Sequence, residues 1–137
     1  MDLHKGSCFC GEVDYRLNAE IKRVMNCHCH FCRSHSGSAF STYAVVPFDS
    51  LEIARGQEKI SAFPFESGKK HFCGTCGIPL FNVNKKYPGL CMLFLGTLEK
   101  ASDITPAVSI WCESKLGWVD TLSSIPSLAQ GPERKNA

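Results

Sequence analysis

Hydrophobic and polar positions alternate over short stretches of the chain, a pattern typical of β-strands with one buried face. Between Cys8 and Leu17, the apolar residues Val13, Tyr15 and Leu17 alternate with charged residues. This alternation predicts a strand in an antiparallel sheet, with one face packed and the other in water. Turn-forming residues separate further apolar stretches, which predict strands over 21–25, 39–46, 51–53, 60–65, 78–83, 90–95 and 107–111.

Helical patterning is scarce. Residues 33–38 are small and polar, so we expect a loop or a single helical turn there. Another helical turn is expected beyond Pro126. The chain contains no internal repeat and no visible linker. These features predict a mainly-β protein with a single domain over residues 1–130 and a flexible C-terminal tail over residues 131–137.

Composition narrows the class of protein. A hydrophobic content of 44% with 20% charged residues is ordinary for a globular protein in water. No apolar run is long enough to cross a bilayer, and the first residues contain no apolar signal segment. We therefore expect a cytoplasmic protein with no membrane partner. Thiols stay reduced in that compartment, so nine cysteines indicate metal or redox chemistry rather than disulfides.

The charge balance gives no reason to expect a nucleic-acid partner. The formal net charge is +2. If seven cysteines bound two zinc ions as thiolates, seven negative and four positive charges would be added, which leaves a net charge of about −1. A chain with this balance has no general attraction for phosphate backbones.

Seven of the nine cysteines fall into three clusters, and the first and third clusters are pairs: Cys8 with Cys10, and Cys73 with Cys76. Alternate residues of a strand point to the same face, so the first pair could reach one ion. The second pair is a Cys-x-x-Cys turn that aims two sulfurs inward. Together they supply the four thiolates of a closed, structural zinc site; redox-active or uncoordinated thiols are the alternative.

The middle cluster contains Cys27, Cys29 and Cys32, with no fourth cysteine nearby. Three protein ligands with one open position are typical of a catalytic zinc site, where a substrate thiolate could take the fourth place. A further protein ligand would instead close the site and make it structural. The candidates for that ligand are His28, His30, His35, Cys91 and Cys112, and the candidate proton carriers are His30, His35 and Glu113.

The three clusters, in this order and spacing, resemble the glutathione-dependent formaldehyde-activating enzyme family, whose relatives include centromere protein V. The matching segments are Gly6–Tyr15, Cys27–Arg33 and Phe72–Gly77, with a weaker echo at Ser109–Lys115. The resemblance implies an Mss4-like fold of small antiparallel sheets, stapled by a structural zinc. It assigns that zinc to Cys8, Cys10, Cys73 and Cys76, and a catalytic zinc to Cys27, Cys29 and Cys32.

The family's reaction joins the thiol of glutathione to formaldehyde and gives S-hydroxymethylglutathione. The resemblance therefore implies a zinc-dependent carbon–sulfur lyase that acts on a small thiol adduct. Two alternatives are a non-enzymatic binding module on the same zinc scaffold and a thiol redox or metal-handling protein. A binding module has no need for a three-cysteine open site, so the middle cluster favours the enzyme. The substrate, the fourth ligand and the oligomeric state stay open.

Overall fold

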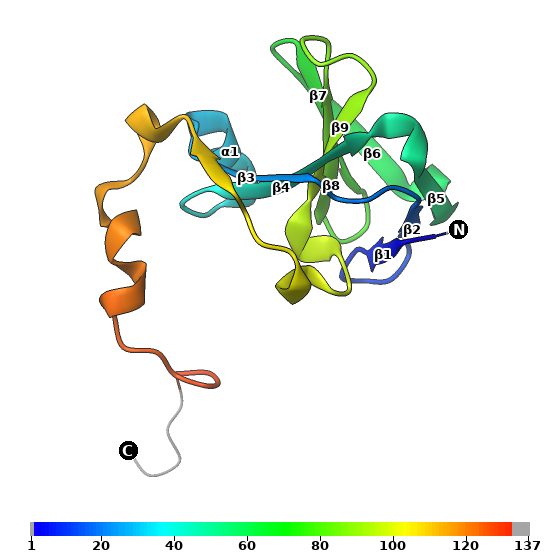
Figure 1. The fold of residues 1–137 in the computed structure, drawn as a ribbon. Coiled ribbons are helices and arrows are strands. Elements are labelled where there is room, and N and C mark those ends of the chain that lie inside the picture. The colour runs from blue at the N-terminus through cyan, green and yellow to red at the C-terminus, as the bar shows by residue number, and fades with distance from the viewer. Residues whose placement is uncertain (1, 133–137) are drawn as a thin grey trace.

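The computed structural model describes residues 2–132, which form mainly β-structure arranged in two sheets (Figure 1). The smaller sheet is antiparallel and has three strands in the order β1-β2-β5. These strands are β1 (His4–Ser7), β2 (Asp14–Leu17) and β5 (Leu51–Arg55). The predicted mainly-β class is confirmed.

The larger sheet has seven strands in the order β10-β3-β4-β9-β8-β7-β6. Its neighbouring strands are antiparallel, except that β10 runs parallel to β3. The bounds are β3 (Arg23–Cys27), β4 (Ser41–Pro47), β6 (Ile60–Phe65), β7 (Gly68–Cys73), β8 (Pro79–Asn84), β9 (Leu90–Phe94) and β10 (Val108–Ile110).

One α-helix, α1 (His30–Ser36), lies within the described residues and is longer than the single turn expected there. The Cys29 sulfur caps its start by accepting a hydrogen bond from the Cys32 N–H, at 3.2 Å. Gly37 ends it in the left-handed conformation that glycine adopts without strain. Short 3-10 helices cover Phe48–Ser50, Gln57–Lys59, Leu95–Thr97, Ala101–Asp103, Cys112–Ser114 and Gly117–Ser124.

Two further sequence expectations, on a strand start and on a helical turn, are wrong. The continuous strand from Cys8 is interrupted, because residues 9–12 form a turn: the Cys8 N–H donates to the Val13 carbonyl, and the Gly11 N–H donates to the Cys8 carbonyl. The strand therefore begins only at Asp14. The helical turn expected beyond Pro126 is also misplaced, since the last described helix ends at Ser124.

Strand β4 separates a hydrophobic core from a second, more accessible face of the larger sheet. Its buried Ala44 and Val46 belong to the core that also contains Tyr15 and Leu17 of the smaller sheet. Cys91 is fully buried in the same core, as a small apolar residue would be. The alternate residues of β4 point to the opposite face, where the middle cysteine cluster lies.

Beyond β10 the chain leaves the sheets, as the orange segment of Figure 1 shows. Several of its large apolar side chains are exposed, among them Trp111, Trp118, Leu122, Ile125 and Leu128. None of the described helices has the length and apolar character needed to cross a membrane. Residues 131 and 132 are exposed, and the rest of the expected C-terminal tail lies outside the described residues.

Gly56, just after β5, packs closely against the backbone of Glu12, which follows the first cysteine pair. We predict that Gly56→Ala destabilises the fold. Gly56 has a φ of 87°, and an added Cβ would overlap the Glu12 carbonyl oxygen. The expected loss in free energy of unfolding is about 2–4 kcal/mol, from strain and overpacking together. Urea unfolding of the metal-loaded protein measures it.

Gly96→Ala is the matched control, because no heavy atom lies within 4 Å of its added Cβ and its φ is not in the left-handed region. Equal stability of the two variants would contradict the close approach at Gly56.

Candidate metal centres

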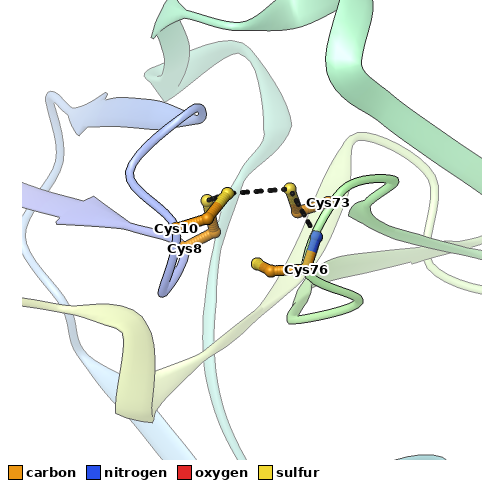
Figure 2. A group of neighbouring side chains, drawn as sticks. All are labelled: Cys8, Cys10, Cys73 and Cys76. Atoms are coloured by element: carbon orange, nitrogen blue, oxygen red, sulfur yellow. Dashed lines mark hydrogen bonds between the residues drawn. The ribbon is translucent and has the colours of Figure 1, made fainter.

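Four cysteine sulfurs converge where the two sheets meet, and we refer to them as the staple site. Cys8 and Cys10 come from the turn before β2, while Cys73 ends β7 and Cys76 lies in the turn that follows (Figure 2). The four sulfurs all lie within 4.8 Å of one another, with 3.6 Å between Cys8 and Cys10 and 3.7 Å between Cys10 and Cys73. These separations exceed a disulfide bond of about 2.05 Å, so the cysteines are free thiols.

The staple site fits a tetrahedral zinc ion. A zinc–sulfur bond of about 2.3 Å in tetrahedral geometry places the sulfurs about 3.8 Å apart, close to the observed separations. Backbone N–H groups also point at the sulfurs: Val13 donates to Cys8 at 3.4 Å and Cys76 donates to Cys73 at 3.5 Å. Such donors stabilise the thiolate form, which is the form that binds metal.

A hydrogen bond joins the two turns beside the sulfurs. The hydroxyl of Thr75 donates to the Glu12 carboxylate at 2.6 Å, across the same 63-residue separation that the Cys10–Cys73 contact spans. The staple site therefore lies at a junction of two turns, which the Thr75–Glu12 hydrogen bond also stabilises. It connects the turn before β2 in the smaller sheet with the end of β7 in the larger sheet.

The middle cluster forms a second group, which we refer to as the triad site. Cys27 ends β3, Cys29 caps α1 and Cys32 lies in the first turn of that helix, and their sulfurs lie within 4.8 Å of one another. Within residues 2–132, no His, Cys, Asp or Glu joins the group as a fourth member. The structure thus brings together all seven cysteines singled out by the sequence, as a set of four and a set of three.

None of the five residues considered for closing the triad site joins the three sulfurs in the described structure, although His30 lies beside them and lines the neighbouring cavity. His28 is buried and packs against the ring of Phe40, with 5.0 Å between ring centroids. His35 packs against Phe31 and Phe94, and burial lowers its pKa to about 4. Cys91 lies in the core and Cys112 is exposed beyond β10. The described structure therefore gives the triad an incomplete set of three protein ligands, compatible with zinc and with one further position.

The three sulfurs of the triad differ in acidity. A hydrogen bond from Cys32 lowers the pKa of Cys27 to about 6. The same interaction, together with burial, raises the pKa of Cys32 far above its ordinary value. This hydrogen bond thus favours the thiolate form of Cys27 and the thiol form of Cys32, and a metal that bound all three sulfurs would displace the remaining protons.

The sequence analysis missed two polar residues beside the triad: Tyr43, which contacts it, and Asn82, which contacts Tyr43. The hydroxyl of Tyr43 lies 3.2 Å from the Cys32 sulfur, and the Asn82 side-chain nitrogen donates to that hydroxyl at 3.3 Å. Because the tyrosine oxygen accepts from Asn82, its own hydrogen is left to donate to Cys32. Burial raises the pKa of Tyr43, so the hydroxyl keeps this hydrogen. Asn82, a polar residue inside an otherwise apolar stretch, is the feature of the sequence that could have indicated this buried contact.

The triad opens onto a cavity of about 600 Å³. The cavity lies on the face of the larger sheet that points away from the hydrophobic core, and α1 and the residues after β10 form parts of its wall. Two of the three candidate proton carriers, His30 and Glu113, line it, whereas His35 does not. Its floor consists of side chains from three adjacent strands, namely Arg23, Met25, Tyr43, Val45, Leu90 and Met92.

The hydrogen bond from Tyr43 should strengthen metal binding at the triad, because it stabilises the Cys32 thiolate. We predict that Tyr43→Phe weakens zinc binding there by about 10- to 100-fold, the range found when a group that hydrogen-bonds a metal ligand is removed. Competition with a chromophoric chelator measures the affinity. Tyr87→Phe is the control, because Tyr87 is exposed and makes no side-chain hydrogen bond to a triad sulfur. Unchanged affinity in Tyr43→Phe would contradict this role.

The chain matches known proteins over most of its length. Residues 3–114 match the family model described as glutathione-dependent formaldehyde-activating enzyme. A Halomonas elongata protein with the provisional name glutathione-dependent formaldehyde-activating enzyme is 26% identical over 126 residues, which cover 86% of this chain and 80% of that protein. A Penicillium rubens protein with the same provisional name is 31% identical over 83 residues, covering 59% of this chain and 44% of that protein.

The fold also occurs in a solved structure. A crystal structure of a Rhodobacter sphaeroides protein superposes with a TM-score of 0.65 at 25% sequence identity, over 77% of this chain and 98% of that one. The matched region of the family model includes the staple site, the triad site and β10. This chain belongs to the glutathione-dependent formaldehyde-activating enzyme family.

Proposed function

We propose that both cysteine groups bind zinc and that the two ions have different roles. The staple site has four sulfurs and needs no further ligand, which supports a structural ion. The triad site has three sulfurs beside a cavity, which supports a catalytic ion with one position for a substrate sulfur. The opening of an incomplete ligand set onto a 600 Å³ cavity is the observation on which this proposal rests.

The proposed reaction is the addition of a thiol such as glutathione to formaldehyde and its reversal, which is carbon–sulfur lyase chemistry. In the forward direction the thiolate sulfur attacks the formaldehyde carbon and a carbon–sulfur bond forms. The π electrons of the carbonyl move to its oxygen, which takes a proton to give the hydroxymethyl group. Bound zinc would supply a thiolate at neutral pH by lowering the pKa of the substrate thiol.

Residues of this chain would orient the reactants and hold the proton. His30 and Glu113 line the cavity, and either side chain could give the proton to the new hydroxyl group. Tyr43 and Asn82 lie beneath Cys32 and would hold one ligand sulfur in a fixed hydrogen-bonded position. The reduced thiols that this chemistry requires suit a cytoplasmic location.

Zinc content distinguishes the two sites. We predict two ions per chain in the natural protein and one in Cys29→Ser, which should stay folded because the staple site is intact. Cys10→Ser should lose the staple ion and much of its folding free energy, since metal binding at such a site contributes directly to folding. Native mass spectrometry and circular dichroism measure these outcomes.

Cys112→Ser is the matched control, because Cys112 is exposed and belongs to neither group, and it should keep two ions. A Cys29→Ser protein that still holds two ions would disprove the assignment of the triad site.

Activity should depend on the triad alone. We predict that the zinc-loaded protein accelerates the interconversion of S-hydroxymethylglutathione with free glutathione and formaldehyde, as measured by exchange NMR. Cys29→Ser should reduce the acceleration to the uncatalysed rate, because it removes a triad ligand while leaving the staple site. Cys112→Ser should retain full activity. Two bound ions without any acceleration would overturn the enzymatic proposal and favour a zinc-scaffold binding module.

A further inference from the structure

The floor of the cavity has a defined order along the larger sheet. Arg23, Met25 and Cys27 are alternate residues of β3 and all line the cavity. Cys27 lies four positions after Arg23 along the strand, a span of about 13 Å at about 3.3 Å per residue. A molecule with its sulfur at the triad would therefore lie along the floor and place its other end near Arg23.

The floor beyond the triad offers apolar contacts up to and including the row of Arg23. Val45 of β4 pairs with Arg23 on one side and Met92 of β9 on the other, and Met25 lies in the adjoining row. Met25, Val45 and Met92 are all partly exposed to the cavity. Two methionines and a valine provide a flexible hydrocarbon surface without hydrogen-bonding groups.

The polar side chains beneath this apolar surface are buried. Tyr43 and Asn82 are only 4% and 3% exposed. The Tyr43 hydroxyl is occupied by Cys32 and by the amide nitrogen of Asn82, and the amide oxygen of Asn82 is shielded from solvent. Among the described side chains in the rows of Met25 and Val45, a ligand therefore finds Arg23 as the accessible polar partner, and the partly exposed Asn84 lies farther along β8.

The wall above the floor is also apolar. Phe31 of α1 stacks on Phe65 at the end of β6, with ring centroids 3.8 Å apart and an interplanar angle of 14°. Both rings line the cavity. A ligand that extends from the triad to the row of Arg23 would thus have hydrocarbon contacts with the floor and with this wall.

The end of the cavity remote from the triad has a positive balance. Arg23 lies there. Lys86 also lines this end, from the turn between β8 and β9. That turn lies beyond the row in which Leu90 pairs with Pro47. Glu66 is the carboxylate at this end, beside the turn where Ser67 hydrogen-bonds Asn84. Glu113 lies at the other end, just after Ile110, which pairs with Cys27. Two cations and one carboxylate favour an anionic group.

We propose that the substrate class of this site is an amphipathic thiol with a hydrocarbon body and an anionic head group, in preference to glutathione. This inference rests on the proposed zinc-thiolate function of the triad. The sulfur would lie at the triad, the hydrocarbon body over Met25, Val45 and Met92, and the head group near Arg23. Glutathione would place peptide groups over the same apolar floor, where they would lose water without gaining partners.

The test is a comparison of thiols on the zinc-loaded protein by isothermal titration calorimetry. The probes are mercaptooctanoate, mercaptooctanol and glutathione, and Cys29→Ser serves as the reference for binding that depends on the triad. We expect mercaptooctanoate to bind at least about tenfold more tightly than glutathione. Mercaptooctanol, which has the same body without the charge, should bind with intermediate affinity.

Two variants separate the parts of the site. Arg23→Gln should weaken mercaptooctanoate several-fold and leave mercaptooctanol unchanged, whereas the control Lys59→Gln, at an exposed position outside the cavity, should change neither. Val45→Thr keeps the shape of the floor and adds a hydroxyl, so it should weaken both mercapto compounds and not glutathione.

The outcomes distinguish this inference from the function on which it rests. Glutathione binding as tightly as mercaptooctanoate, with both dependent on the triad, would overturn the substrate class and leave the zinc-thiolate function in place. Equal effects of Arg23→Gln on mercaptooctanoate and mercaptooctanol would overturn the head-group assignment. Failure of every thiol to bind in a triad-dependent way would overturn the proposed function and this inference together.

Discussion

The convergence of four cysteine sulfurs between the two sheets is the constraint on which the rest of the structure depends. Cys10 and Cys73 lie 63 residues apart in the chain and 3.7 Å apart at their sulfurs. As thiolates, four sulfurs this close would repel one another unless a cation lay between them, so the zinc proposed here would link this junction and the folding of both sheets to metal binding. The Thr75–Glu12 hydrogen bond and the close packing of Gly56 on Glu12 belong to the same junction.

A second constraint is the register of β4, which contributes to the core and to the cavity at once. Ala44 and Val46 pack toward the smaller sheet, while Tyr43 and Val45 face the cavity beside the triad. A slip of one residue would exchange these faces and expose the core residues. The packing of the core thereby fixes the position of the Tyr43 hydroxyl beneath Cys32, and the stability of the fold and the geometry of the site are coupled.

Local sequence patterns located most strands but not all of their ends. The strand over 60–65 was predicted with its correct bounds, because Gly and charged residues flank an apolar stretch. Sequence analysis predicts no strand over β7, because Gly68, Lys69 and Lys70 give no apolar alternation, and pairing with both β6 and β8 makes this segment a strand. Cys8 was assigned to a strand, whereas hydrogen bonds to its backbone and its sulfur form a turn.

The sequence alone determined which side chains could bind metal, because the cysteines are close together in each cluster and their chemistry is independent of the fold. It also determined the mainly-β class, through alternation that depends only on neighbouring residues. Only the tertiary structure decided that Tyr43 and Asn82 lie beneath Cys32, and that Met25, Val45 and Met92 form one apolar floor. These residues come from four different strands, and their contacts depend on the register between strands, which no local pattern records.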